Sequence, residues 1–297
     1  MPKTNKFKNL KRLNFINAGI VLIYLIKTIL KIKPSEKEIQ VYVYYNILIH
    51  SNGYFKSETS DYYVTEFKNN STKIIKLRKK PSSDIDVFQQ VYGWEEYSEV
   101  VKQFKQHFHE NSDYSINIID AGSNIGLTSL FFLDHFNKPN IICLEPELEN
   151  FKILDFNIKN NETHKIVKIN AAIWSSNKKI KIVRDFRDRQ DWSFRVEETN
   201  ELDGVQAYSI NQLVREYKYE LIDILKIDVE GSEKQIFTSE NANVDFLEIT
   251  KCIALEIHDE FNCRNDIYKV LDNYGFSFFN KGELTIGINN NLLNEYK

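Results

Sequence analysis

The sequence has few cysteines and no cysteine pair. Its three cysteines are scattered, are odd in number and include no C-x-x-C motif. This argues against a disulfide framework or a zinc ribbon, and it favours a reducing compartment. The sequence also contains no internal repeat and no low-complexity segment. Its 297 residues, 42% hydrophobic and 27% charged, suit one large globular domain or one domain with an extension.

No apolar run is as long as an ordinary membrane span. In residues 1–33 the uninterrupted run extends only from Ala18 to Ile26, whereas a spanning helix needs about 20 mostly apolar residues. No small-residue cleavage site follows it, as a signal peptide would require. We therefore predict a separate N-terminal helix in residues 1–35, with three open interpretations. It lies on an anionic membrane surface, packs on the domain or on a partner subunit, or spans the membrane once.

The charge of the chain is unevenly distributed. The net charge is −3, but the first 35 residues carry eight Lys and Arg and no acid, which leaves 31 basic and 42 acidic residues elsewhere. A body this acidic is a poor nucleic-acid binder, so we expect no nucleic-acid partner. The basic segment favours a cytoplasmic protein that is peripheral to a membrane or anchored at it.

Strand and helix signals alternate along most of the chain. Residues 36–110 are expected to precede the main domain, with strands at "IQVYVYYNILIH" and "STKIIKLRK" and helical spacing in "DIDVFQQVYGWEEYSEVVKQFKQHF". Residues 111–297 predict an α/β fold with a mostly parallel sheet covered by helices on both faces. The stretch "FSFFNKGELTIGINN" predicts a closing antiparallel hairpin with a tight Lys-Gly turn. The helices of the main domain are expected at residues 126–136, 147–160, 209–218, 232–238 and 264–274.

A glycine-containing loop follows the first strand of the main domain. "DAGSNIG" reads D-x-G-x-x-x-G and lacks the third glycine of the G-x-G-x-x-G motif. Gly122 allows a sharp turn and close approach of a ligand, and the helix that begins near Gly126 presents N–H groups that suit an anion. Asp120 is a poor neighbour for a pyrophosphate but suits a cationic ligand such as S-adenosylmethionine. The alternative is a tight strand–helix turn with a solvated acid.

Other polar residues also stand just beyond predicted strands, where ligands bind in such sheets. Glu145 in "CLEP" suits the two hydroxyls of a ribose, although the same acid occurs in NAD-binding folds. In "DILKIDVEGSEKQIF", Lys226, Asp228 and Glu230 alternate along an apolar strand and its exit. Buried charges are costly unless they are paired or used, so these residues form either a structural ion pair or part of an active site.

Several of these segments together resemble a known family. "IIDAGSNIGLTSLFF", "CLEPELENFKILDFNIKNN", "NAAIW", "IDILKIDVEGSE" and "ALEIHD", in that order, are similar to the FkbM family of S-adenosylmethionine-dependent methyltransferases over roughly residues 75–290. The resemblance implies a Rossmann-like class I methyltransferase with a seven-stranded sheet, S-adenosyl-L-methionine as cofactor, and O-methylation of hydroxyl groups. The residues that we expect at the cofactor are Asp120, Gly122, Asn124, Gly126, Glu145, Ala172 and Asp228.

The expected reaction needs an aligned acceptor and a base. The sulfonium already activates the methyl group. Orientation of the acceptor can therefore lower the activation barrier by roughly 7–11 kcal/mol, and a base increases the rate about 10²–10⁴-fold. His258 has the pKa range of a base, and its alternative is a satisfied structural histidine. Asp228 and Glu230 are expected to orient the acceptor, help as base or bind a divalent ion. With Glu256 and Asp259 they include Mg²⁺ ligand types, but the spacing is not diagnostic, so we predict no metal.

Two further segments have open roles. "VRDFRDRQDWSFRVEE", which contains four arginines and Trp192, is either a solvated connection or a lid that grips an anionic acceptor. Tyr92 and Tyr97 either cover the cofactor or pack in the core.

We therefore expect an O-methyltransferase that acts on a hydroxyl of a sugar or glycoconjugate. The alternatives are a methyltransferase for a lipid, small metabolite or protein side chain, and a catalytically silent membrane-associated binding module of the same fold. A nicotinamide dehydrogenase is disfavoured by the glycine loop. The oligomeric state is not predicted.

Overall fold

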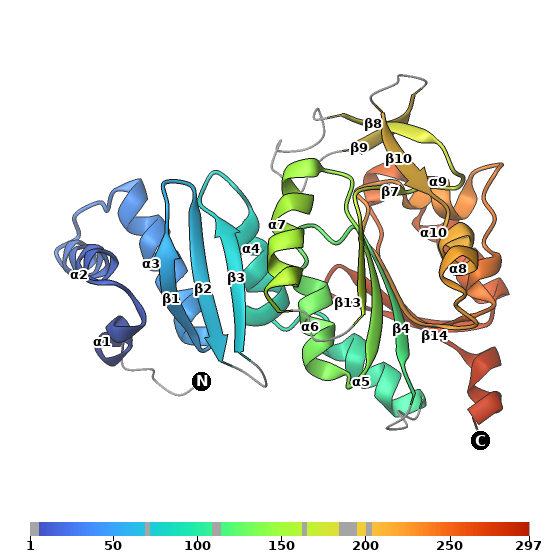
Figure 1. The fold of residues 1–297 in the computed structure, drawn as a ribbon, viewed down its shortest axis with the longest axis horizontal. Helices are drawn as coiled ribbons and strands as arrows, with labels where there is room; N and C mark the ends of the chain where they lie inside the picture. The colour runs from blue at the N-terminus through green and yellow to red at the C-terminus, as the bar shows by residue number, and fades with distance from the viewer. Residues whose placement is uncertain are drawn as a thin grey trace. The chain divides into compact units, whose positions relative to one another are not determined.

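The structure is a computed structural model, and it describes residues 6–68, 72–108, 114–161, 165–183, 195–199 and 204–296. The chain divides into two compact units, Met1–Glu95 and Glu96–Lys297 (Figure 1). This division falls earlier than the predicted one at residue 110, because the helix at Ser98–His107 packs on the sheet of the second unit.

The first unit combines helices with a small antiparallel sheet. Strands β1, β2 and β3 pair in that order, each antiparallel to the next. Helices α2 and α3 pack against each other through the apolar residues Val21, Val41 and Tyr45. The elements are α1 (Lys6–Asn9), a 3-10 turn (Leu10–Arg12), α2 (Phe15–Ile29), α3 (Glu36–His50), β1 (Gly53–Glu58), β2 (Tyr62–Lys68), β3 (Thr72–Arg78), α4 (Asp84–Phe88) and a π-helical turn (Gln89–Gly93).

Residues 39–50 form most of α3, so the prediction of a strand there is wrong. The segment is rich in β-branched and aromatic residues, which favour strands. A capping box overrides this preference: the Glu38 N–H donates to Ser35 Oγ (3.3 Å), and the Ser35 N–H donates to Glu38 Oε2 (2.8 Å). The helix then buries residues at helical spacing, namely Val41, Tyr44, Tyr45, Ile47 and Leu48.

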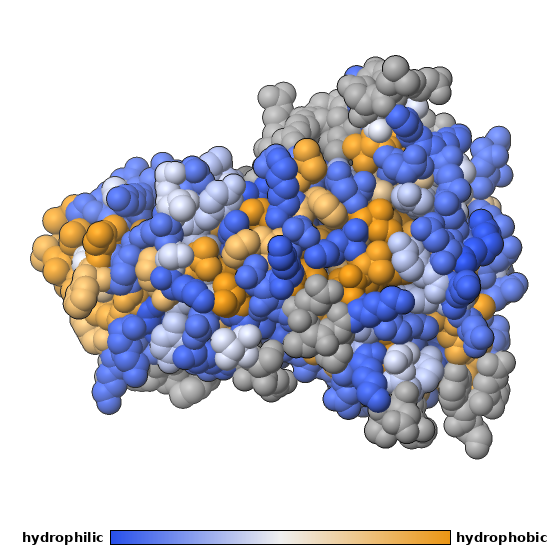
Figure 2. Space-filling view, viewed as in Figure 1, coloured by the Kyte–Doolittle hydropathy of each residue, from blue (hydrophilic) through white to orange (hydrophobic). Residues whose placement is uncertain are grey.

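One side of α2 is apolar and exposed. Phe15 is 98% exposed, and Ile16, Ile26 and Ile29 are also exposed. Figure 2 shows apolar surface gathered on the part of the first unit where Figure 1 draws α2. Within the described residues, no helix has both the length and the apolar character needed to cross a membrane.

The second unit is built on a seven-stranded sheet in the order β13-β14-β12-β11-β4-β5-β6. The strands from β12 to β6 are parallel, and β14 runs antiparallel to both β12 and β13. The predicted mostly parallel sheet and its closing hairpin are therefore confirmed. The strands are β4 (Ile116–Ala121), β5 (Pro139–Leu144), β6 (Ile166–Ile169), β11 (Ile222–Ile227), β12 (Thr250–Glu256), β13 (Phe276–Lys281) and β14 (Leu284–Asn289).

Helices lie on both sides of this sheet, with α5, α6 and α7 on one side and α8, α9 and α10 on the other (Figure 1). All five helices predicted for the main domain are present, because each buries an apolar face on the sheet. The helices are α5 (Ser98–His107), α6 (Leu127–His135), α7 (Leu148–Lys159), α8 (Ile210–Tyr217), α9 (Glu233–Thr238) and α10 (Arg264–Asn273).

A second, smaller sheet of the same unit was not predicted. It has the order β7-β10-β8-β9. Its strands have only two to five residues, too few for a clear periodic pattern. They are β7 (Ala172–Ile173), β8 (Lys179–Val183), β9 (Arg195–Glu198) and β10 (Val205–Tyr208).

Candidate functional site

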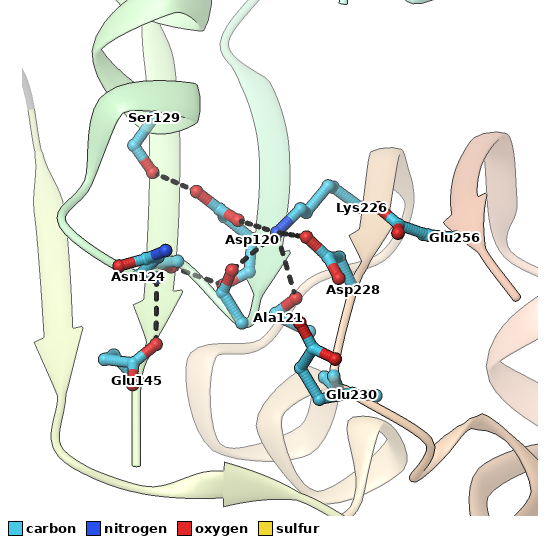
Figure 3. Close-up of polar contacts among 12 residues, drawn as sticks. Asp120, Ala121, Asn124, Ser129, Glu145, Lys226, Asp228, Glu230 and Glu256 are labelled. Atoms are coloured by element: carbon cyan, nitrogen blue, oxygen red, sulfur yellow. Dashed lines mark hydrogen bonds and ion pairs between the residues drawn. The ribbon is translucent and has the colours of Figure 1, made fainter. Parts of the chain in front are cut away.

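The carboxyl ends of β4, β11 and β12 bring together most of the charged residues singled out in the sequence (Figure 3). In the parallel register Lys226 of β11 lies beside Asp120 of β4 on one side and Ala254 of β12 on the other. The Asp228 N–H continues the ladder by donating to Ala121 O at 3.1 Å. The neighbouring strand ends therefore form one continuous polar site.

Lys226 is the centre of the site. Its side chain is 2% exposed, and its Nζ lies 3.4 Å from Asp120 Oδ1 and 3.6 Å from Asp228 Oδ2. Nζ also donates to the backbone carbonyls of Ala121 and Gly122. Burial alone lowers the pKa of Lys226, but Asp228 and Asp120 raise that pKa above its usual value. The lysine therefore stays charged and joins the loop after β4 to the turn after β11.

Asp120 is fully buried, which is not what a solvated acid in a turn would show. Its Oδ2 accepts a hydrogen bond from Ser129 Oγ of α6 at 2.6 Å, while Oδ1 faces Lys226. The carboxylate thus ties β4 to α6 and β11 at once. Ser129 had no signal in the sequence, because a serine within an apolar helix segment is ordinary.

The two glycines of the loop lie close to the turn after β11 and to α7. Gly122 has a φ of +78°, and a Cβ there would lie 1.7 Å from Asp228 O. Gly126 has a φ of +82°, and a Cβ there would lie 3.2 Å from Leu154 of α7. The close approach at these glycines is therefore to the turn after β11 and to α7.

Glu145 is bound to the same loop. Its Oε2 accepts from the Asn124 N–H at 2.8 Å, and its Oε1 accepts from the Glu147 N–H at 2.9 Å. Asn124 itself has a positive φ of 48°. Burial raises the pKa of Glu145 to about 7, although these backbone hydrogen bonds lower it.

Ala172 lies apart from these contacts. It pairs with Ala207 in the small sheet and belongs to that sheet's apolar cluster. The nearby residue that does contact the site is Asn170, whose Nδ2 donates to Glu145 O at 2.9 Å. A lone asparagine in a connection gave no signal in the sequence.

A second group of charges surrounds His258 at the end of β12. Its Nδ1 lies 2.8 Å from Glu233 Oε1, and its Nε2 lies 3.3 Å from Glu230 Oε2 and 3.7 Å from Glu256 Oε1. Burial lowers the pKa of His258, but the nearby carboxylates of Glu230 and Glu233 outweigh it and raise the pKa to about 11. The imidazole is therefore charged at neutral pH, which opposes the predicted role as a base.

Other acids of this region also have raised pKa values. Repulsion from Asp228, together with burial, raises the pKa of Glu256 to about 9. Burial, Asp228 and Glu283 raise the pKa of Glu96 to about 7. The surroundings of Asp228 therefore carry an excess of negative charge. Glu96 and Glu283 had no role in the sequence interpretation, since neither follows a parallel strand.

The remaining candidates from the sequence take different places. Tyr97 is buried against Phe131 and Phe132, as expected for core packing. Tyr92 stacks on Phe88 in the first unit. Residues 184–194 of the arginine-rich segment, which include Trp192, lie outside the described residues, whereas its end forms β9.

Comparison with known proteins identifies the chemistry. Residues 120–278 match the family model described as the methyltransferase FkbM domain. "Methyltransferase sdnD" of Sordaria araneosa is 25% identical over 206 residues, which cover 58% of this chain and 79% of that protein.

Solved structures give similarities of lower identity. Methyltransferase FkbM from Methylobacillus flagellatus KT is 15% identical with a TM-score of 0.38, over 69% of this chain and 53% of that one. The chain thus matches about half of that protein's length. The N-terminal domain of human METTL16, solved with SAH, is 10% identical with a TM-score of 0.39, over 84% of this chain and 80% of that one.

Proposed function

Because the chain belongs to the FkbM methyltransferase family, we propose that it transfers a methyl group from S-adenosylmethionine to a hydroxyl of a sugar or glycoconjugate. The observation that carries the proposal is the contact between Glu145 and the glycine loop through the Asn124 N–H. A carboxylate has about four acceptor positions. The N–H groups of Asn124, Glu147 and Asn150 use three of them, so the carboxylate keeps one position for a ribose hydroxyl beside the loop.

The positive groups of the donor need a carboxylate that they can reach. Asp120 is fully buried against Lys226 and Ser129, whereas Asp228 is 28% exposed. We therefore assign the contact with the ammonium or sulfonium to Asp228. Asp120 then acts indirectly, because it holds Lys226 and the start of α6, on which the loop depends.

The transfer itself needs alignment and removal of one proton. A lone pair of the acceptor oxygen forms the new O–CH₃ bond, the electrons of the S–CH₃ bond return to sulfur, and the hydroxyl proton leaves. Because His258 is charged at neutral pH, the proton passes to the carboxylates of Asp228 or Glu230. His258 orients Glu230 from 3.3 Å.

Donor binding can be tested through Glu145. Glu145→Gln keeps the shape but removes the charge, and a hydrogen bond to a charged group contributes about 1.5–3 kcal/mol, so we expect S-adenosylhomocysteine to bind about 10- to 100-fold more weakly. Glu149→Gln is the matched control, because Glu149 is an exposed acid in the first turn of the following helix, α7, and pairs with Lys152. Calorimetry measures both, and unchanged affinity of Glu145→Gln would contradict the assignment.

The acceptor class can be tested with methyl-labelled donor. Purified protein is incubated with separate cell extracts of glycans, lipids, small metabolites and proteins, and we expect label in the glycan fraction, at a base-resistant ether. Label in another fraction would identify one of the alternative acceptors. Donor binding without label in any fraction would identify a silent binding module.

For the N-terminal unit we propose contact with an anionic membrane surface. The apolar side of α2 is exposed, and Lys31 and Lys33 follow it, the combination typical of interfacial helices. We expect the protein to sediment with phosphatidylserine vesicles but not with neutral ones. Ile16→Glu with Ile29→Glu should abolish sedimentation, whereas Phe279→Glu, at an exposed apolar residue of β13, should not. Equal sedimentation of both variants would contradict the proposal.

A further inference from the structure

The side chains around His258 have the composition of a metal-ion site. Asp228, Glu230 and His258 each offer one ligand atom, and these atoms all lie within 4.8 Å of one another. Ligands bound at about 2.0–2.2 Å from one ion lie about 3 to 4.4 Å apart. Small side-chain rotations therefore suffice to bring all three onto a common ion.

The orientation of His258 is a second and independent observation. The side chain is 2% exposed, and its Nε2 makes no hydrogen bond among the described residues, although it points toward Glu230 and Glu256. Its other nitrogen, Nδ1, faces the fully buried carboxylate of Glu233 at 2.8 Å. A histidine that binds metal commonly donates its second N–H to a carboxylate in this way, which fixes the ring and its tautomer.

The local charge also favours a cation. Glu233 and Glu256 add to the ligand carboxylates, and Lys226 and the imidazole are the cations that face them among the ion pairs of the described residues. A divalent ion would reduce the repulsion between these carboxylates at the point where they converge.

We propose that Asp228, Glu230 and His258 bind one divalent transition-metal ion of the Mn²⁺ type, with Glu233 orienting the histidine. One nitrogen and two carboxylate ligands suit Mn²⁺ better than Mg²⁺ or Ca²⁺, which prefer oxygen. Three protein ligands leave coordination positions open, where an acceptor oxygen is able to bind. That catalytic role rests on the proposed function but changes its proton acceptor. The ion displaces the proton of His258 Nε2 and binds Asp228 and Glu230, and it lowers the pKa of a bound hydroxyl, whose proton then leaves to water instead of to either carboxylate.

The competing explanation is a purely structural ion-pair cluster, in which a protonated His258 occupies the position of the metal. Titration of chelator-treated full-length protein with MnCl₂, without donor or acceptor, separates the two. Calorimetry and the loss of the free Mn²⁺ paramagnetic resonance signal should both give one ion per chain. A folded protein that binds no Mn²⁺ overturns the proposal.

Variants then identify the ligands. Asp228→Asn and His258→Gln should weaken Mn²⁺ binding at least tenfold, and Glu233→Gln should weaken it about 10- to 100-fold. Asp259→Asn is the matched control, because it removes the same charge beside His258 from an exposed carboxylate that binds Arg264. An equal loss in Asp259→Asn would show a general acidic surface and would overturn the site.

Glu230 allows a test that misfolding cannot imitate. Its φ is +50°, a region that favours glycine. Glu230→Gly should therefore keep or raise the melting temperature while Mn²⁺ binding is lost; retained Mn²⁺ binding would remove Glu230 from the site.

The metal site and the proposed function can fail separately. S-adenosylhomocysteine binding is measured in chelator, and Mn²⁺ binding is measured without any nucleoside. If the nucleoside binds and Mn²⁺ does not, only the metal inference is wrong. If Mn²⁺ binds and the nucleoside does not, the donor assignment is wrong.

Discussion

Replacing Lys226 by Met tests the central ion pair of the site. Methionine keeps the length of the apolar stem, so the packing of β11 is preserved and the main loss is the positive charge. That charge serves two carboxylates, but unequally. Asp228 is partly exposed and can be hydrated instead, whereas Asp120 is fully buried and keeps only the hydrogen bond from Ser129.

The expected cost follows from this difference. Removing one partner of a buried ion pair costs about 3–5 kcal/mol, because the other charge is left buried without compensation. We expect the free energy of unfolding of the Lys226→Met protein to fall within that range. Since domains are stabilised by only about 5–15 kcal/mol in total, the variant should be close to its stability limit at 25 °C.

A double variant separates charge from packing. Asp120→Asn keeps a side chain that can accept the Ser129 hydrogen bond but removes the buried charge. Combined with Lys226→Met, it should recover about 1–3 kcal/mol of the loss. Urea denaturation followed by far-ultraviolet circular dichroism measures all four proteins. A Lys226→Met cost below about 1 kcal/mol, or strict additivity in the double variant, would refute the reasoning.

Two other predictions concern the glycine loop and Glu145. Gly122→Ala places a Cβ 1.7 Å from Asp228 O and should leave little soluble folded protein, whereas Gly282→Ala, with a φ of +62° but open space, should cost only about 1–2 kcal/mol in melting experiments; similar melting temperatures would contradict this. The folded pKa of Glu145, about 7, is above its usual 4.5, so its contribution to stability is full below pH 4.5 and is lost as pH rises through 7. Relative to Glu145→Gln, the free energy of unfolding of the native protein should therefore fall by up to about 3 kcal/mol between pH 4.5 and pH 7. If the melting temperatures of the two proteins change in parallel with pH, Glu145 does not titrate in this way.

The main-domain fold could be predicted because its signals are local and repeated. Each helix from α7 to α10 shows apolar residues at helical spacing, α6 is a mostly apolar run after the glycine loop, and each central strand is a short apolar run. The helix α3 was mistaken for a strand because propensity favoured a strand, while the decisive contact is the capping box between Ser35 and Glu38. The small sheet was missed because β7 has two residues and is held by β10, far along the chain.

The sequence predicted that the site residues follow neighbouring strands, but it did not predict their contacts with one another. Parallel strands necessarily bring Asp120, Glu145 and Asp228 to one edge. The sequence does not reveal that Asp120 faces Lys226, since that depends on the register between two strands. It also conceals Glu233, which reaches His258 only after α9 has folded. The sequence showed suitable ligand types among these residues, but their spacing along the chain did not predict the convergence of Asp228, Glu230 and His258 on which the proposed metal site rests.

The contact between Gly122 and the carbonyl of Asp228 limits how the protein can evolve. Position 122 requires glycine because the turn after β11, which is distant in the sequence, lies against it. The loop after β4 and the turn after β11 must therefore change together. A related enzyme with a larger residue at 122 should carry a compensating insertion or displacement after β11. Grafting either segment alone into another scaffold would transfer it without the segment against which it packs.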